Sequence, residues 1–212
     1  MSGVVLYDYW RSSASYRVRI ALNLAGITYR AVSVDLVAGD HKSDAHLTRN
    51  PQGLVPVLEI DGLRLTQSLA IIDYLDMTRG LGLLPAEPGI RAQALALAQT
   101  IAIDLHPVCN LSVARHATAL SGNAEGMPGN WMNHFIRPGL LAFEAQLGGF
   151  QQTPYCTGPQ PGLADLCLIP QMYNARRYQV DLTDLPRILG VEAACAKHPA
   201  FAAAHPDQHA PT

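Results

Sequence analysis

Two adjacent serines, Ser12 and Ser13, stand at the junction between an apolar run at 4–7 and a helical stretch at 16–24. A hydroxyl in the first turn of a helix lies among unpaired backbone N–H groups, at the positive end of the helix dipole. Such a place stabilises an anion, and a thiolate would suit it well. Serine is also a common N-cap of amphipathic helices, so the junction alone leaves a binding role and a capping role open.

A proline marks the start of a second segment that could bind a ligand. Pro56 stands where the apolar run 55–60 should begin as a strand, and proline cannot donate to a sheet ladder. An edge position or a cis Val55–Pro56 bond would explain it. If the bond is cis, the backbone N–H and C=O of Val55 turn outward and can pair with an extended peptide. An ordinary trans proline at the beginning of a strand is the alternative.

A third segment resembles the first in its chemistry. Gln67 and Ser68 precede an apolar helix at 69–75, so the first N–H groups of that helix point outward. A ligand carboxylate could dock there. Ser68 could equally be a plain helix cap.

Strand and helix signals alternate over the first 78 residues, which indicates an α/β half. We expect strands at 4–8, 29–34, 55–60 and 63–66, and helices at 13–25, 41–49 and 68–78. Asp61-Gly62 tolerates the positive φ of a tight hairpin, so the last two strands should be antiparallel neighbours.

Glycine and proline break this pattern between residues 79 and 89, and long helical stretches follow at 90–117, 131–148, 163–178 and 183–196. We therefore expect an α/β domain at 1–79, a linker at 80–89 and an all-helical domain at 90–212. The last dozen residues have no amphipathic period, so we expect them to lie loosely on the surface.

Composition excludes several classes of protein. The 212 residues are 49% hydrophobic, and 15 basic against 17 acidic residues leave a net charge of -2, without the basic excess of a nucleic-acid binder. No signal peptide or membrane span is visible, so we expect a soluble cytoplasmic protein. The four cysteines form no Cys-x-x-Cys pair and the eight histidines show no ligand spacing, so no metal site is expected.

Taken together, the three segments resemble the glutathione-binding domain of the cytosolic glutathione transferases. The resemblance narrows at residues 11–22, RSSASYRVRIAL, which look like the signature of the zeta class, the maleylacetoacetate and maleylpyruvate isomerases. Further matches cover nearly the whole chain: Asn50-Pro51, Val55-Pro56, residues 67–72, 110–113, 164–171 and 180–183. The resemblance implies a thioredoxin-like domain followed by a helical domain, usually in a homodimer with the active cleft between the two domains.

The resemblance also implies roles for individual residues. Ser12 and Ser13 would be catalytic and would steady the thiolate of glutathione, the implied cofactor. The other glutathione-binding residues would be Val55 and Pro56 at the cysteinyl backbone, Gln67 and Ser68 at the γ-glutamyl end, His41 near the glycine end, and His106 and Asn110 from the second domain.

The implied reaction is a cis–trans isomerisation in which glutathione is a coenzyme. Its thiolate adds to the olefinic carbon of a cis-enedione acid, the resulting enolate rotates, and elimination returns glutathione with the trans product. The substrate is a dianion, which calls for arginines. The candidates are Arg11, Arg176 and Arg177, and the last two point about 100° apart on a helix, so only one of them should face the substrate.

Leu111-Ser112 follow Asn110, where some maleylpyruvate isomerases carry arginines, which favours maleylacetoacetate and the breakdown of tyrosine or phenylalanine. The Arg176-Arg177 pair favours maleylpyruvate instead. A general zeta-class transferase acting on alkyl halides, α-haloacids or peroxides would consume glutathione, which separates it from the isomerases.

Two departures from the family pattern stand out. Ala14 stands where many zeta-class members have a cysteine. Loss of that cysteine would suit a binding module without catalysis. Since the isomerisation needs only the thiolate of the cofactor, we expect activity to survive. Pro161-Gly162 replaces the usual Ser or Thr cap before Asp165, and glycine is a weaker but acceptable cap.

Overall fold

The computed structural model describes residues 3–150 and 154–211. The chain divides into two compact units, one formed by the residues up to Gly82 together with those from His198 on, the other by Leu83–Lys197. The expected domains at 1–79 and 90–212 differ from this division, because the C-terminal segment belongs to the first unit. Residues 1–2 and 212, at the outer ends of those domains, lie outside the described residues.

The first unit is an α/β structure, as expected. Its elements before the second unit are β1 (Val5–Asp8), α1 (Ser13–Leu24), β2 (Arg30–Ser33), the 3-10 helix η1 (Asp40–Lys42), α2 (Asp44–Leu47), β3 (Val57–Ile60), β4 (Leu63–Thr66) and α3 (Ser68–Arg79).

The four strands form one mixed sheet in the order β2-β1-β3-β4. β2 runs parallel to β1, whereas β3 is antiparallel to both β1 and β4. Asp61 and Gly62 have φ of 52° and 78° at the β3–β4 turn, which confirms the hairpin predicted from this dipeptide.

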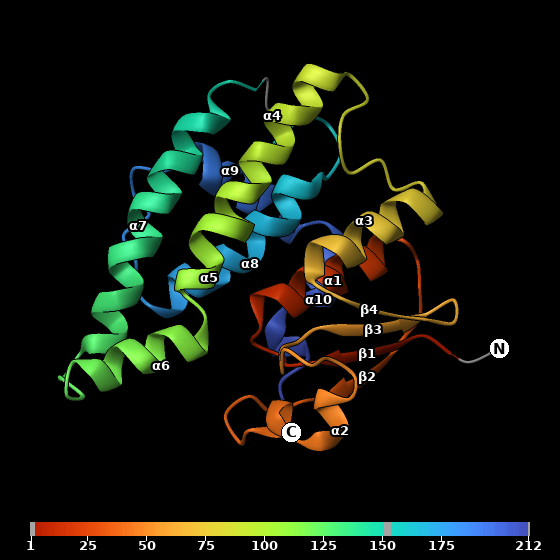
Figure 1. Cartoon of the computed structure of the whole chain (residues 1–212). Coiled ribbons are helices and arrows are strands. Elements are labelled where there is room, and N and C mark those ends of the chain that lie inside the picture. The colour runs from red at the N-terminus through yellow and green to blue at the C-terminus, as the bar shows by residue number, and fades with distance from the viewer. Residues whose placement is uncertain (1–2, 151–153, 212) are drawn as a thin grey trace. The chain divides into compact units, whose positions relative to one another are not determined.

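Side chains alternate between the two faces of the sheet. Leu6 and Leu58 are fully buried in the core, while Val5, Tyr7 and Val57 form a separate buried cluster. Helices α1 and α3 pack against one another on one side of the sheet, and α2 lies on the other side (Figure 1). This layering holds the first turns of α1 and α3 at fixed positions relative to the strand ends.

The C-terminal residues do not lie loosely on the surface, so that expectation is wrong. They form α10 (Pro199–Ala204) and the 3-10 helix η3 (Pro206–Gln208), and α10 packs against α1. Phe201 is only 2% exposed, and Asn23 of α1 donates to the carbonyl of Ala200 over 2.9 Å. Six residues are too few to show an amphipathic period, yet burial of one aromatic side chain is enough to dock them.

The second unit is helical apart from an isolated bridge between Tyr155 and Gly158, as far as its described residues go. Its elements are α4 (Pro88–Gln99), the π-helix η2 (Thr100–Leu105), α5 (His106–Val108), α6 (Leu111–Leu120), α7 (Met127–Leu147), α8 (Leu163–Arg177) and α9 (Pro186–Ala196).

The single helix expected at 90–117 is wrong. The hydrogen bonding changes from α-helical to π-helical before His106-Pro107, and the helix then ends. Asn110 begins a new helix as its N-cap, and its side chain accepts from the N–H of Ser112 over 3.0 Å. Proline supplies no N–H and asparagine caps well, so this pair of residues explains the break.

Helix α8 forms the centre of this unit and packs against α4, α7 and α9. Every residue from Leu163 to Met172 is buried. Gly162 is its N-cap, and the buried Asp165 carboxylate accepts from the N–H of Gly162 over 2.8 Å and of Cys156 over 2.9 Å. A glycine cap is therefore supported by the carboxylate of the first turn.

In the described part of the chain, no single helix is long and apolar enough to cross a membrane. One bent pair of segments, Pro88–Val108 with Leu111–Leu120, meets the criteria of length and composition only when taken together.

Candidate functional site

Strand register brings three of the predicted segments to one end of the sheet. Tyr7 of β1 pairs with Val57 of β3, and Val57 pairs with Thr66 of β4. Ser12 follows that end of β1, Val55-Pro56 precede that end of β3, and Gln67-Ser68 follow that end of β4. The three segments, separated by up to 56 positions in the sequence, therefore share one edge of the first unit.

Ser12 is the N-cap of α1, with φ −68° and ψ 120°. Its Oγ accepts from the N–H of Ser15 over 3.2 Å, so the capping role left open by the sequence is real. A serine hydroxyl has one proton and two lone pairs, so this bond leaves the O–H proton to donate elsewhere. Ser12 can therefore cap the helix and donate to an anion at the same time. Ser13 lies in the first turn of the same helix and is 9% exposed.

Arg11 is held by the two aromatic residues that precede it. Its guanidinium donates to the Tyr9 hydroxyl over 2.9 Å and lies 4.7 Å from the centroid of the Trp10 ring. Stacking of this kind restrains a guanidinium without neutralising it. The cation next to Ser12 is thus partly immobilised before any ligand binds.

The Val55–Pro56 bond is cis, which decides between the alternatives left open by the sequence. The strand it precedes is not an edge, since β3 lies between β1 and β4. Within residues 3–150 and 154–211, no hydrogen bond engages the N–H or C=O of Val55. These two groups are therefore available to pair with an extended peptide.

Two buried side chains hold the loop before Val55. Asn50 donates to the carbonyl of Leu54 over 2.8 Å, and the His46 ring nitrogen Nε2 lies 3.0 Å from the same oxygen. Both side chains are buried, at 3% and 1% exposure. The match at Asn50-Pro51 pointed to this loop, but no spacing signal connected His46 with it.

Ser68 is not the cap of α3, so that alternative is wrong. Gln67 occupies the N-cap with φ 67°, and its side chain donates to Gln52 over 2.9 Å instead of capping the helix. Ser68 is the first helical residue, 7% exposed, and accepts from Arg17 over 3.4 Å. The first-turn N–H groups of α3 therefore have no side-chain cap and can receive an anion.

His41 lies in η1, which follows the end of β2 that is level with Asp8 of β1. The residue is partly buried, and its carbonyl oxygen lies close to Gly53, where an added Cβ would come within 3.1 Å of it. The loop with His41 thus packs against the chain that leads into Val55-Pro56.

His106 and Asn110 lie in the second unit, at the start of α5 and of α6. The Oδ1 atom of Asn110 accepts from both the N–H and the hydroxyl of Ser112. Between them, Cys109 is buried, and burial raises the pKa of its thiol to about 11. That thiol stays protonated near neutral pH and is not itself a nucleophile there.

The two arginines at the end of α8 differ in their contacts. Arg176 forms a bidentate ion pair with Glu192 of α9, whose hydrogen bonds raise the pKa of the guanidinium. Arg177 is exposed, stacks at 5.4 Å on the Tyr178 ring, and makes a 3.5 Å contact with Asn174. Arg176 joins α8 to α9, whereas Arg177 keeps donors for a ligand carboxylate.

Comparisons with a protein-family model and with known proteins agree on the family of this chain. Residues 2–77 match the glutathione S-transferase N-terminal domain family. The chain is 56% identical to the maleylacetoacetate isomerase of Rhizobium meliloti over 208 residues, covering 98% of both chains. This chain belongs to the zeta-class glutathione transferase family.

Other members of the zeta class resemble it nearly as completely. The maleylpyruvate isomerase of a Ralstonia species is 40% identical over 95% of this chain and 96% of its own. A solved holo structure of a zeta-class maleylpyruvate isomerase superposes with a TM-score of 0.92 at 40% identity, covering 95% of this chain and 96% of that one. The maleylacetoacetate isomerase of Methylobacterium extorquens, solved with malonate and glutathione, gives the same TM-score at 39% identity over 98% of this chain and all of its own.

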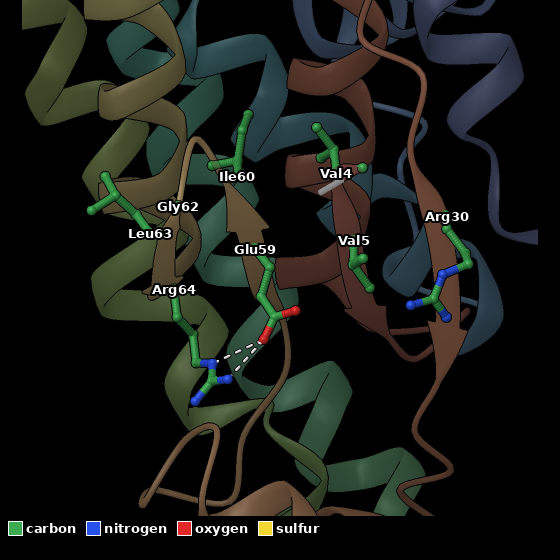
Figure 2. A pocket seen from close by; sticks show the side chains of 9 residues that line it. Val4, Val5, Arg30, Glu59, Ile60, Gly62, Leu63 and Arg64 are labelled. Carbon is green, nitrogen blue, oxygen red and sulfur yellow. Dashed lines mark hydrogen bonds and ion pairs between the residues drawn. The ribbon is translucent and has the colours of Figure 1, made fainter. Parts of the chain in front are cut away.

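This zeta-class chain also has a groove away from the predicted segments. It encloses about 740 Å³ at the opposite end of β1, beside Val4 and Val5 (Figure 2). Its charged side chains are Arg30, Glu59 and Arg64, and the last two form an ion pair at 2.9 Å. None of the predicted site residues lines it, and no cluster of three His, Cys, Asp or Glu side chains fit for a metal occurs among the described residues.

Proposed function

We propose that this chain is a glutathione-dependent cis–trans isomerase that converts maleylacetoacetate to fumarylacetoacetate in the breakdown of tyrosine and phenylalanine. The observation that carries the proposal is the 56% identity, over nearly the full length of both chains, to a protein named maleylacetoacetate isomerase. The glutathione reported in two related maleylacetoacetate isomerase structures supports the choice of cofactor.

The residues at the sheet end fit the chemical groups of glutathione. The free N–H and C=O of Val55 suit its cysteinyl backbone, with Pro56 fixing the turn of the chain. The uncapped first turn of α3, with Gln67 and Ser68, suits the carboxylate of the γ-glutamyl end. We assign His41, His106 and Asn110 to the rest of the tripeptide.

Bound glutathione supplies a thiolate that adds reversibly to the double bond, so that the bond can rotate. The Ser12 hydroxyl, together with the first-turn N–H groups of α1, lowers the pKa of that thiol from its usual value of about 8.5. Ser13, in the same turn, supports this anion site. Ala14 leaves the chain without a second thiol at this position, and none is needed when the cofactor provides the nucleophile.

Arginines hold the two carboxylates of the substrate in this proposal. Arg177 is the better candidate on α8, because the guanidinium fork of Arg176 is already occupied by Glu192. Arg11, stacked beside Ser12, is the candidate in the first unit. Malonate and citrate in two related maleylacetoacetate isomerase structures show that such small polycarboxylates bind to those relatives.

We assign the chain to a homodimer in the cytoplasm. Exposed apolar side chains on each unit, such as Met77 at 76% and Ile103 at 52%, suit burial in an interface. All four cysteines are free and buried, which suits a reducing compartment. Light scattering of the purified chain should give twice the mass of 22.9 kDa.

Substrate preference is tested by comparing maleylacetoacetate with maleylpyruvate at substoichiometric glutathione. We expect faster loss of the cis isomer of maleylacetoacetate, since Leu111 and Ser112 add no cation after Asn110. Faster turnover of maleylpyruvate would assign the chain to that pathway instead. No turnover of either, with glutathione consumed by α-haloacids or peroxides, would make it a conjugating enzyme.

A further inference from the structure

A buried arginine lies directly behind Ser68. Arg17, on the second turn of α1, is 2% exposed, and its Nη1 donates to the Ser68 Oγ over 3.4 Å. The two residues are 51 positions apart and meet because α1 and α3 pack side by side. Arginine is rarely buried so completely without a specific partner, so we ask what the contact with Ser68 does.

The contact fixes which hydrogen-bonding role the Ser68 hydroxyl can play. Arginine has only donors, so Arg17 must occupy a lone pair of the Ser68 oxygen. The single hydroxyl proton is then left to donate away from α1. A donor whose own oxygen is bound by a cation is also polarised toward stronger donation.

The surroundings of Ser68 leave one kind of ligand for that proton. Gln67 does not cap α3, so the first-turn N–H groups stand open beside the Ser68 hydroxyl. All of these groups are donors, and they share the positive end of the helix dipole. A carboxylate is the ligand that satisfies several donors at once.

We infer that Arg17 is a positioning residue that turns the Ser68 hydroxyl into a dedicated donor for the carboxylate at the γ-glutamyl end of glutathione. The inference rests on the proposed function, since it names a second layer behind the glutathione site. Arg17 acts through Ser68 and does not itself touch the ligand.

The test uses two ligands that differ only in that carboxylate: glutathione and 4-aminobutanoyl-cysteinyl-glycine. Calorimetry would measure both affinities for the wild type, Arg17→Lys, Ser68→Ala and the double variant, with circular dichroism as the check of folding. We expect the wild type to prefer glutathione by roughly 10- to 100-fold, the range of a lost bond to a charged group. Each single variant should lose about five- to tenfold of that preference and keep its affinity for the analogue.

The double variant should lose no more than either single variant, because the two residues act as one unit. Additive losses, or equal weakening of both ligands by Arg17→Lys, would overturn the role of Arg17. Failure of the wild type to bind glutathione at all would instead refute the proposed function, so the two failures are distinguishable.

A measurement on the wild type covers the case in which Arg17→Lys does not fold. The guanidinium ¹⁵N–¹H signals of Arg17, assigned by their contact with Ser68, should shift when glutathione binds and stay in place with the analogue. Arg19, also fully buried, has no contact with Ser68 and provides the internal control. Identical shifts of Arg17 with both ligands would contradict the inference.

Discussion

The proposed role of the Ser12 hydroxyl is compatible with its role as a helix cap. Its oxygen accepts from the N–H of Ser15, and a hydroxyl that accepts one bond can still donate its proton to an anion. Truncating a serine that only caps a helix lowers the stability of the protein. Truncating a serine that stabilises a thiolate lowers the turnover of the enzyme. The two effects can therefore be separated by experiment.

Ser12→Ala should lower turnover roughly 100-fold, the scale of removing one donor from a developing or bound anion, while the affinity for glutathione changes little. The measurement is kcat and the glutathione dissociation constant, taken together. Ser43 is the matched control, since it caps α2 through a 3.3 Å bond to the N–H of His46. Ser43→Ala should cost about 1 kcal/mol of stability and leave kcat unchanged, and equal loss of turnover and affinity in Ser12→Ala would contradict the thiolate role.

The adjacent arginines of α8 provide a second paired test. Arg177→Leu should raise the KM for the dicarboxylate about tenfold or more, because a charge-assisted bond to one carboxylate is lost. Arg176→Leu should leave KM nearly unchanged and lower stability by no more than about 1 kcal/mol, since its ion pair with Glu192 is partly exposed, at 55% and 21% of the two side chains. Steady-state kinetics that show the opposite order would assign the substrate contact to Arg176.

At the scale of elements, the parts of the fold with strong local signals were predictable. The Asp61-Gly62 turn and the β3–β4 pair followed from backbone preference alone. The break after Val108 was missed, although Pro107 and Asn110 carried the signal for it. A π-helix has no distinct periodicity in sequence, so η2 was not predictable in this way.

Site residues divide along the same line. The candidate segments at Ser12, Val55-Pro56 and Gln67-Ser68 could be selected from the sequence because caps and prolines have local signatures. Arg17 and His46 contact these segments from behind, and neither could be selected, because their contacts depend on how α1, α3 and the loop pack. Tertiary contacts of this kind have no signature in spacing.

Arg19 joins three elements of the first unit. Fully buried, it pairs with Asp8 at the end of β1 at 2.6 Å and donates to the carbonyls of Trp10 and Ala204, at 2.9 and 3.1 Å. The C-terminal segment is thereby tied to the loop that leads into Ser12.

Arg19→Met should lower the free energy of unfolding by about 3–5 kcal/mol, because Asp8 is then buried without its cation. Urea denaturation measures this change, with Arg64→Met as the control. The pair of Arg64 with Glu59 is partly exposed, at 46% and 30% of the two side chains, so its loss should cost at most about 1 kcal/mol. Equal effects of the two substitutions would show that the buried pair does not hold these elements together.

For the molecule as a whole, buried thiols predict sensitivity to alkali. Burial raises the pKa of Cys109 from 9.0 to about 11 and also raises the pKa of Cys156 and of Cys195. A thiol with a raised folded-state pKa stabilises the protein fully below the unfolded value, and that stability is lost as the pH rises through the folded value.

Between pH 9 and pH 11, the free energy of unfolding should therefore fall with pH, by about 1.4 kcal/mol per pH unit for each such thiol. Urea denaturation across this range measures the slope. Cys109→Ala should make the slope shallower by about 1.4 kcal/mol per pH unit, which is the contribution of one proton. An unchanged slope would mean that Cys109 titrates alike in the folded and unfolded chain.

The central claim is that glutathione acts as a coenzyme in this chain and is not consumed. The most direct test follows the ultraviolet absorbance of maleylacetoacetate at substoichiometric glutathione while the free thiol is titrated. The account predicts many turnovers per glutathione with the thiol concentration constant. Loss of one thiol for each substrate molecule converted, or no conversion at all, would contradict it.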